Sequence, residues 1–119
     1  MMNSILNSIK KLLGIDSDYD AFDTDIIMNI NSVFFKLYQL GIGPRDAPFS
    51  ISDETAEWSD FSNSEIYIAM VKMYVYTLVR LVFDPPQSST LADVLQSNAD
   101  EMQFRLYMQA QNEIENGVK

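Results

Sequence analysis

The segment of residues 66–83 limits the fold more than any other part of the chain. Lys72 and Arg80 are its only charged residues, so it predicts a helix over residues 64–83 that other parts of the protein cover on most sides. Its length also raises a membrane-spanning alternative. The two charges oppose that alternative, because each costs ~2.5–3.5 kcal/mol near the centre of a bilayer. Lys72, Tyr76 and Arg80 recur every four residues, which predicts one hydrated seam along this helix.

Three further stretches carry apolar residues at helical spacing, at residues 3–13, 26–40 and 89–111. Glycines at positions 14, 41 and 43 end the first two of these stretches. Asp23 or Thr24 is expected to be the N-cap of the second stretch. Pro85 and Pro86 separate the last stretch from the helix of residues 64–83. The sequence therefore predicts an all-α fold: a compact bundle of about four helices with a loop or short β-hairpin between the second and third.

The 119 residues suffice for one domain, which we assign to residues 1–119. Alternation around Phe49 favours a short strand within the loop of residues 45–64, and Trp58 and Phe61 are expected to anchor this loop onto the helices. The polar segment of residues 109–119 is expected to be a flexible C-terminal tail.

Composition excludes several classes of function. The 17 acidic and 8 basic residues give a formal net charge of -9, which opposes generic nucleic-acid binding and docking on anionic membranes. The chain contains no Cys and no His, so it has neither a disulfide framework nor the usual residues of a catalytic triad. We expect no enzyme activity and no cofactor.

Two acidic groupings raise chemical alternatives. Asp16, Asp18 and Asp20 resemble the start of a calcium-binding loop, but Ala21 stands where glycine is needed and Ile27 where a bidentate Glu belongs. We therefore favour a solvated linker that leads into the second helix.

Paired carboxylates for acid–base catalysis are the other alternative. Asp100 and Glu101 are adjacent on a helix and point different ways, and Asp53, Glu54 and Glu57 lie in a loop with no pocket signature.

The last two long helices are also rich in Met and Tyr. Most of these side chains are expected in the core, and a surplus of them is typical of an interface between subunits. The residues concerned are Met70, Met73, Tyr74, Tyr76, Met102, Tyr107 and Met108.

The chain resembles the small head–tail connector family of tailed bacteriophages, also called head-completion adaptors. The resemblance covers about residues 5–106 and rests on an ordered set of segments, of which Arg80 followed by Phe83-Asp84-Pro85-Pro86 before a final helix is the most specific. The others are residues 9–15, 23–31, 40–44 and 58–61.

This resemblance implies a structural virion protein that assembles under the capsid portal as a homo-oligomeric, dodecameric ring and is monomeric alone. Such a ring, formed in the bacterial host cytoplasm, extends the DNA channel and joins the portal to the next connector or tail component. Since a ring needs two different contact patches, we predict subunit contacts at Phe49, Trp58, Phe61, Tyr76 and Arg80. The predicted portal-docking residues are Tyr107, Met108, Glu113, Ile114 and Val118.

The acidic charge fits a channel that surrounds DNA without sequence-specific binding, because carboxylates repel phosphates and let the duplex slide. The predicted channel face comprises Asp16, Asp18, Asp20, Asp53, Glu54 and Glu57. An alternative with the same charge is an acidic decoy that mimics DNA and inhibits a DNA-binding enzyme. A decoy is expected to spread its carboxylates along an extended face, whereas here they cluster in two loops.

Overall fold

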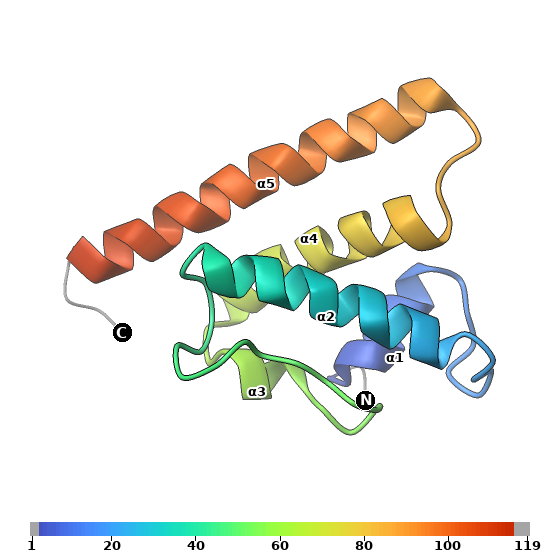
Figure 1. The fold of residues 1–119 in the computed structure, drawn as a ribbon, viewed down its shortest axis with the longest axis horizontal. Coiled ribbons are helices and arrows are strands. Elements are labelled where there is room, and N and C mark those ends of the chain that lie inside the picture. The colour runs from blue at the N-terminus through green and yellow to red at the C-terminus, as the bar shows by residue number, and fades with distance from the viewer. Residues whose placement is uncertain (1–2, 116–119) are drawn as a thin grey trace.

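The computed structural model describes residues 3–115, with side chains described through residue 112, and this part of the chain forms helices and loops. The helices are α1 (Ile5–Leu12), α2 (Asp23–Gln39), α3 (Trp58–Phe61), α4 (Glu65–Phe83) and α5 (Ser89–Glu115). The predicted all-α fold is confirmed, with one short helix, α3, beyond the four expected. Figure 1 shows α5 as an outer layer along α4, with α1, α2 and α3 on the other side of α4.

The central helix is α4, which packs against each of the other four helices. Val75 and Val79 are fully buried. Tyr74 is also buried, and its hydroxyl donates to Oε1 of Gln103 on α5 over 2.8 Å. Burial, followed by the negative charge of Asp100, raises the pKa of Tyr74 to about 12. Among the described residues α4 is the one helix long and apolar enough for a membrane span, and 28% of that stretch is buried within the subunit, less than the predicted cover on most sides.

Phe34 of α2 organises the packing of the loop between α2 and α3. Its ring centroid lies 5.0 Å from that of Phe49, 5.3 Å from that of Phe61 and 6.2 Å from that of Trp58. Nε1 of Trp58 donates to Oγ of Ser8 over 2.8 Å, which also ties the loop to α1. The prediction that Trp58 and Phe61 anchor this loop is confirmed.

Of the two forms expected between the second and third long helices, the segment is a loop. The side chain of Asn31 takes the place of a partner strand: its Nδ2 donates to the Ile51 carbonyl over 2.9 Å, and its Oδ1 accepts from the Ile51 amide over 2.8 Å. Within the described residues the backbone pairing is limited to one isolated bridge between Ser4 and Glu57. A β-hairpin here was therefore wrong, because an amide side chain satisfies the extended backbone.

The predicted stops of the first two helices are confirmed. At the end of α2, the Gly41 amide donates to the Tyr38 carbonyl over 3.0 Å, and the Ile42 amide donates to the Leu37 carbonyl over 2.9 Å. This is a Schellman motif, and α1 ends in the same pattern at Gly14.

Two helix boundaries differ from expectation. Phe22 occupies the N-cap position of α2 without a side-chain hydrogen bond, and Asp23 is already helical, so the predicted cap at Asp23 or Thr24 was wrong. Asp23 instead pairs with a buried lysine, as described below. The last helix begins at Ser89 as predicted but continues through Glu115, four residues beyond the predicted end at 111. Part of the predicted tail is therefore helical.

Candidate assembly surfaces

Three predicted subunit-contact residues pack within the subunit itself. Trp58 and Phe61 are 3% and 4% exposed, and Phe49 is half-buried against Phe34 and Phe61. Trp58 and Phe61 therefore hold the loop in place from inside and leave little surface for a neighbouring subunit. Their predicted role in a subunit contact stays a prediction.

The other two predicted contact residues, Tyr76 and Arg80, are half-buried on α4. Nη1 of Arg80 lies 3.3 Å from the Tyr76 hydroxyl and donates to it. Ile66 and Met73 precede Arg80 at intervals of seven residues, so they share its face of the helix. Both are exposed, Ile66 at 78%. We call these four residues the α4 stripe: an apolar surface with a cation towards one end. Ile66 was not predicted as a contact residue, although its spacing from Met73 could have indicated it.

The C-terminal half of α5 carries a second apolar surface. Leu106 and Ala110 are buried, whereas Tyr107 and Met108 are exposed. Phe104, which the sequence analysis missed, is 64% exposed and shares their face at i, i+3 and i+4 spacing. We call Phe104, Tyr107 and Met108 the α5 face. Of the other predicted docking residues, Glu113 and Ile114 belong to α5 with side chains outside the described part, and Val118 lies outside the described residues.

The six predicted channel-face residues are all exposed, but they form two separate groups. Oγ of Ser4, at the start of α1, donates to the Glu54 carbonyl over 2.7 Å, so Asp53, Glu54 and Glu57 lie near that end. Asp16, Asp18 and Asp20 follow the other end. An eight-residue helix is about 12 Å long, which sets the scale of their separation.

Asp53 is held in its loop by local hydrogen bonds. The side-chain hydroxyl of Thr55 donates to Oδ1 of Asp53, and the Thr55 amide donates to the same oxygen over 2.9 Å. These two bonds, the side-chain one being the stronger influence, lower the pKa of Asp53 below its ordinary value.

The linker that carries Asp16, Asp18 and Asp20 is held by a lysine that the sequence analysis did not identify. Lys10 of α1 is buried, and its Nζ donates to the carbonyls of Ser17 over 3.1 Å and Tyr19 over 2.8 Å. The same Nζ lies 2.8 Å from Oδ1 of Asp23, the counter-charge for that buried oxygen. The linker was predicted to be a solvated segment, but the side chain of Lys10 fixes it to α1. Lys10 follows the apolar Leu6 by one turn, but a lysine at such a position usually extends to solvent, so this spacing alone does not indicate burial.

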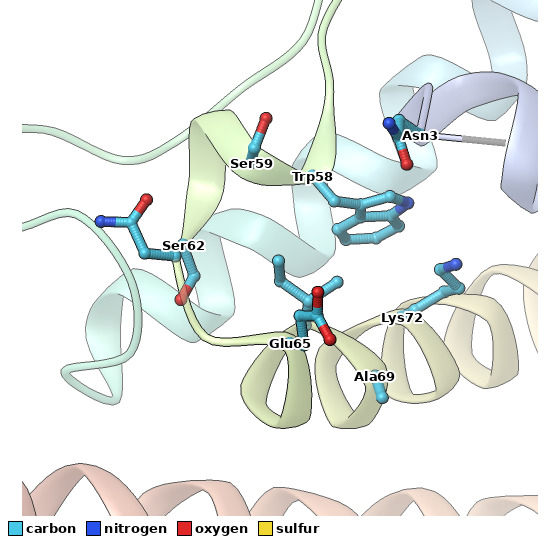
Figure 2. Close-up of a pocket in the computed structure, with 9 residues that line it drawn as sticks. Asn3, Trp58, Ser59, Ser62, Glu65, Ala69 and Lys72 are labelled. Carbon is cyan, nitrogen blue, oxygen red and sulfur yellow. The ribbon is translucent and has the colours of Figure 1, made fainter. Parts of the chain in front are cut away.

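An open pocket of about 460 Å³ lies between α3 and α4. Figure 2 shows the Trp58 ring and the Lys72 side chain on one wall, with Nζ of Lys72 5.8 Å from the ring centroid. Glu65 is the one carboxylate among the lining residues. The lining therefore offers no pair of carboxylates for acid–base catalysis. Lys72 is half-buried here, as Tyr76 and Arg80 are further along α4, which fits the predicted seam.

The remaining candidate carboxylates have partners on the surface of α5. Asp100 accepts from Nε2 of Gln96 over 3.0 Å, and Glu101 forms an exposed ion pair with Arg105 over 2.7 Å. Within residues 3–112, no group of three or more Asp or Glu side chains is arranged to hold a metal ion.

In the described residues the molecule thus combines a helical core with exposed apolar helix faces and acidic loops. That combination is typical of a structural subunit that assembles with other proteins. The chain matches the family model described as phage connector protein over residues 5–113, so it belongs to this family. It is a structural head–tail connector of a bacteriophage, a virion component that interacts with other head and tail proteins. No curated protein and no solved structure matches the chain.

Proposed function

We propose that this connector assembles as a ring beneath the capsid portal, extends the DNA channel and joins the head to the next connector or tail component. The observation that carries the proposal is a pair of separate apolar surfaces, the α4 stripe and the α5 face, on different helices of one subunit. A ring needs two different patches that meet in a head-to-tail manner, and a ring that forms on the portal needs a further surface for that template.

The two surfaces suit different partners. The α4 stripe includes Tyr76 and Arg80 and supplies one of the two patches of the subunit–subunit contact. The α5 face, with Glu113, Ile114 and Val118 beyond it, docks on the portal protein. On this proposal the free chain is monomeric and a dodecameric ring forms on the portal, which holds the subunits side by side.

The acidic groups line the DNA channel in this proposal. Their positions near opposite ends of α1 favour a subunit in which α1 runs along the channel, since both groups then face the same duplex. Uncompensated carboxylates there repel phosphates and leave the DNA free to move without sequence-specific contacts.

The test is to mix the purified chain with its cognate portal and to image the complex by electron microscopy. Ring density beneath the portal is the expected result. Met73→Asp in the α4 stripe should abolish the ring, whereas Met28→Asp, at an exposed Met on α2, is the matched control and should leave it intact.

Two outcomes would contradict the proposal. The first is a ring that forms equally well with Met73→Asp. The second is tight binding to a nuclease without portal affinity, which would favour the decoy alternative. The separation of the two acidic groups argues against that alternative, because a DNA mimic needs a continuous acidic track.

A further inference from the structure

Three aromatic rings form a ladder where the linker between α1 and α2 crosses the end of α4, with two exposed rings and the half-buried ring of Phe83. The ring centroids of Tyr19 and Phe22 are 5.7 Å apart, and those of Phe22 and Phe83 are 5.3 Å apart, both in edge-to-face geometry. Tyr19 is 52% exposed and Phe22 is 42% exposed. Neighbouring exposed aromatic rings of this kind are typical of a surface that binds another protein.

Carboxylates surround this ladder. Asp16, Asp18 and Asp20 lie in the same linker, and Asp84 directly follows Phe83; all four are exposed. Within residues 3–112 the ion pairs are those of Lys10 with Asp23 and Arg105 with Glu101, so none of these four carboxylates has a cation of its own. We call Tyr19, Phe22 and Phe83, with Asp16, Asp18, Asp20 and Asp84, the acidic–aromatic patch.

The patch is held in one arrangement before any partner arrives. Nζ of Lys10 holds the Ser17 and Tyr19 carbonyls by hydrogen bonds. The Tyr19 amide donates to the Asp16 carbonyl over 3.1 Å, and the Asp23 amide donates to the Asp20 carbonyl over 3.2 Å. A surface ordered in this way loses little conformational entropy when it binds.

We infer that the acidic–aromatic patch binds a segment of a partner protein that presents arginine beside apolar side chains. A guanidinium stacks on aromatic rings and forms paired hydrogen bonds with carboxylates, so it satisfies both features of the patch at once. The unpaired negative charge disfavours an acidic partner and attracts a basic one.

The place of the patch in the fold identifies which kind of partner this is, and this step rests on the proposed function. Phe83 ends α4 and is joined to the start of α5 by residues 84–88, whereas the α5 face occupies the other half of α5. The 27 residues of α5 span about 40 Å. Figure 1 shows the linker and the end of α4 on the right and the end of α5 on the far left. If the α5 face docks on the portal, the partner of the patch is the basic segment of a different head or tail protein. That protein meets the linker carboxylates at one end of the proposed channel, whereas Asp53, Glu54 and Glu57, near the other end of α1, face the DNA alone.

The chain contains an internal control for charge alone. The loop with Asp53, Glu54 and Glu57 is also acidic and exposed, but no large apolar side chain between residues 36 and 65 is exposed. A basic ligand drawn by charge alone would visit both regions, whereas one recognised by aromatic rings and carboxylates together would bind at the patch.

The experiment titrates the isotopically labelled chain with a synthetic peptide of Arg-Leu-Gly repeats and follows amide chemical shifts by NMR. We expect saturable shifts at residues 16–22 and 83–84 with little change at residues 53–57. A Glu-Leu-Gly peptide should cause none. Phe22→Ser should weaken peptide affinity about tenfold through loss of the central ring, and Phe35→Ser, at a comparably exposed Phe on α2, should leave it unchanged.

Tyr19→Ser provides a second variant should Phe22→Ser disturb the start of α2. Equal shifts in both acidic regions, no saturable binding, or unchanged affinity in both variants would each overturn the inference. Ring formation on the portal is measured separately with the same variants. Normal rings with lost peptide binding support a distinct partner surface, and lost rings with retained peptide binding would contradict it. Failure of ring formation by the wild-type chain bears on the proposed function and leaves the peptide result intact.

Discussion

The linker of residues 13–22 and the loop of residues 40–57 are both acidic, yet they are held to the helices by different forces. The loop is anchored by apolar packing, because the rings of Phe49, Trp58 and Phe61 all pack against Phe34. The linker is anchored by a buried cation, because Lys10 binds two of its carbonyls and Asp23. Apolar anchors tolerate changes of pH and salt, whereas a buried charge depends on every one of its partners.

The largest expected effect is on the loop. Trp58→Ala removes a buried ring and its hydrogen bond to Ser8, and should lower the free energy of unfolding by ~4 kcal/mol, measured by urea denaturation. Phe35→Ala, at an exposed ring on α2, is the control and should change stability little. Loss of ring assembly in Trp58→Ala with unchanged stability would instead place Trp58 in a subunit contact.

The matching test of the linker is Lys10→Met. It keeps the apolar stem but leaves the buried oxygen of Asp23 without its counter-charge and two carbonyls without a donor. We expect a loss of ~3 kcal/mol in unfolding free energy, together with faster amide hydrogen exchange at residues 17–22. Lys11→Met changes an exposed neighbour and should have a small effect. Equal stability in the two variants would show that the cation does not anchor the linker.

The same contrast explains what the sequence could predict. The anchors of the loop are large apolar residues in a polar stretch, so Trp58 and Phe61 could be identified by residue type alone. Lys10 could not, because lysine is nearly always exposed and its partners at 17 and 19 are backbone carbonyls, which leave no side-chain pattern.

The helices divide in the same way. The run that forms α4 is long enough for its composition to define it, and the glycine stops of α1 and α2 follow from local hydrogen bonding. The four residues of α3 are too short for any periodicity. The exposure of Phe22 and Phe104 depends on which helices lie nearby, and that information is absent from spacing along one helix.

A smaller loss of stability is expected when one glycine in each of the two segments is replaced by alanine. Gly43 and Gly14 both have positive φ, 93° and 82°, a conformation that is strained for alanine. A Cβ on Gly43 would lie 2.5 Å from Cε1 of Phe61, whereas a Cβ on Gly14 would meet nothing within 4 Å. Gly43→Ala should therefore cost ~2 kcal/mol and Gly14→Ala ~1 kcal/mol, compared by thermal denaturation. The reverse order would mean that the Phe61 ring moves aside easily.

The smallest expected effect on stability comes from a comparison of two carboxylates, one that stabilises its loop through hydrogen bonds and one that does not. Hydrogen bonds from Thr55 lower the pKa of Asp53 in the folded protein, so its contribution to stability is present above the ordinary pKa of an unfolded Asp, about 3.9. That contribution is lost as the pH falls through the lowered pKa, because the protonated form no longer gains from both bonds. Asp53→Asn should therefore be slightly less stable than the wild type at pH 6, and the difference should shrink as the pH falls below about 3.9, as measured by urea denaturation. Asp18→Asn, in the linker, removes a repelled charge and should give a small change of the opposite sign at pH 6. The same sign and size in both variants would show that net charge, rather than the Thr55 hydrogen bonds, sets the effect.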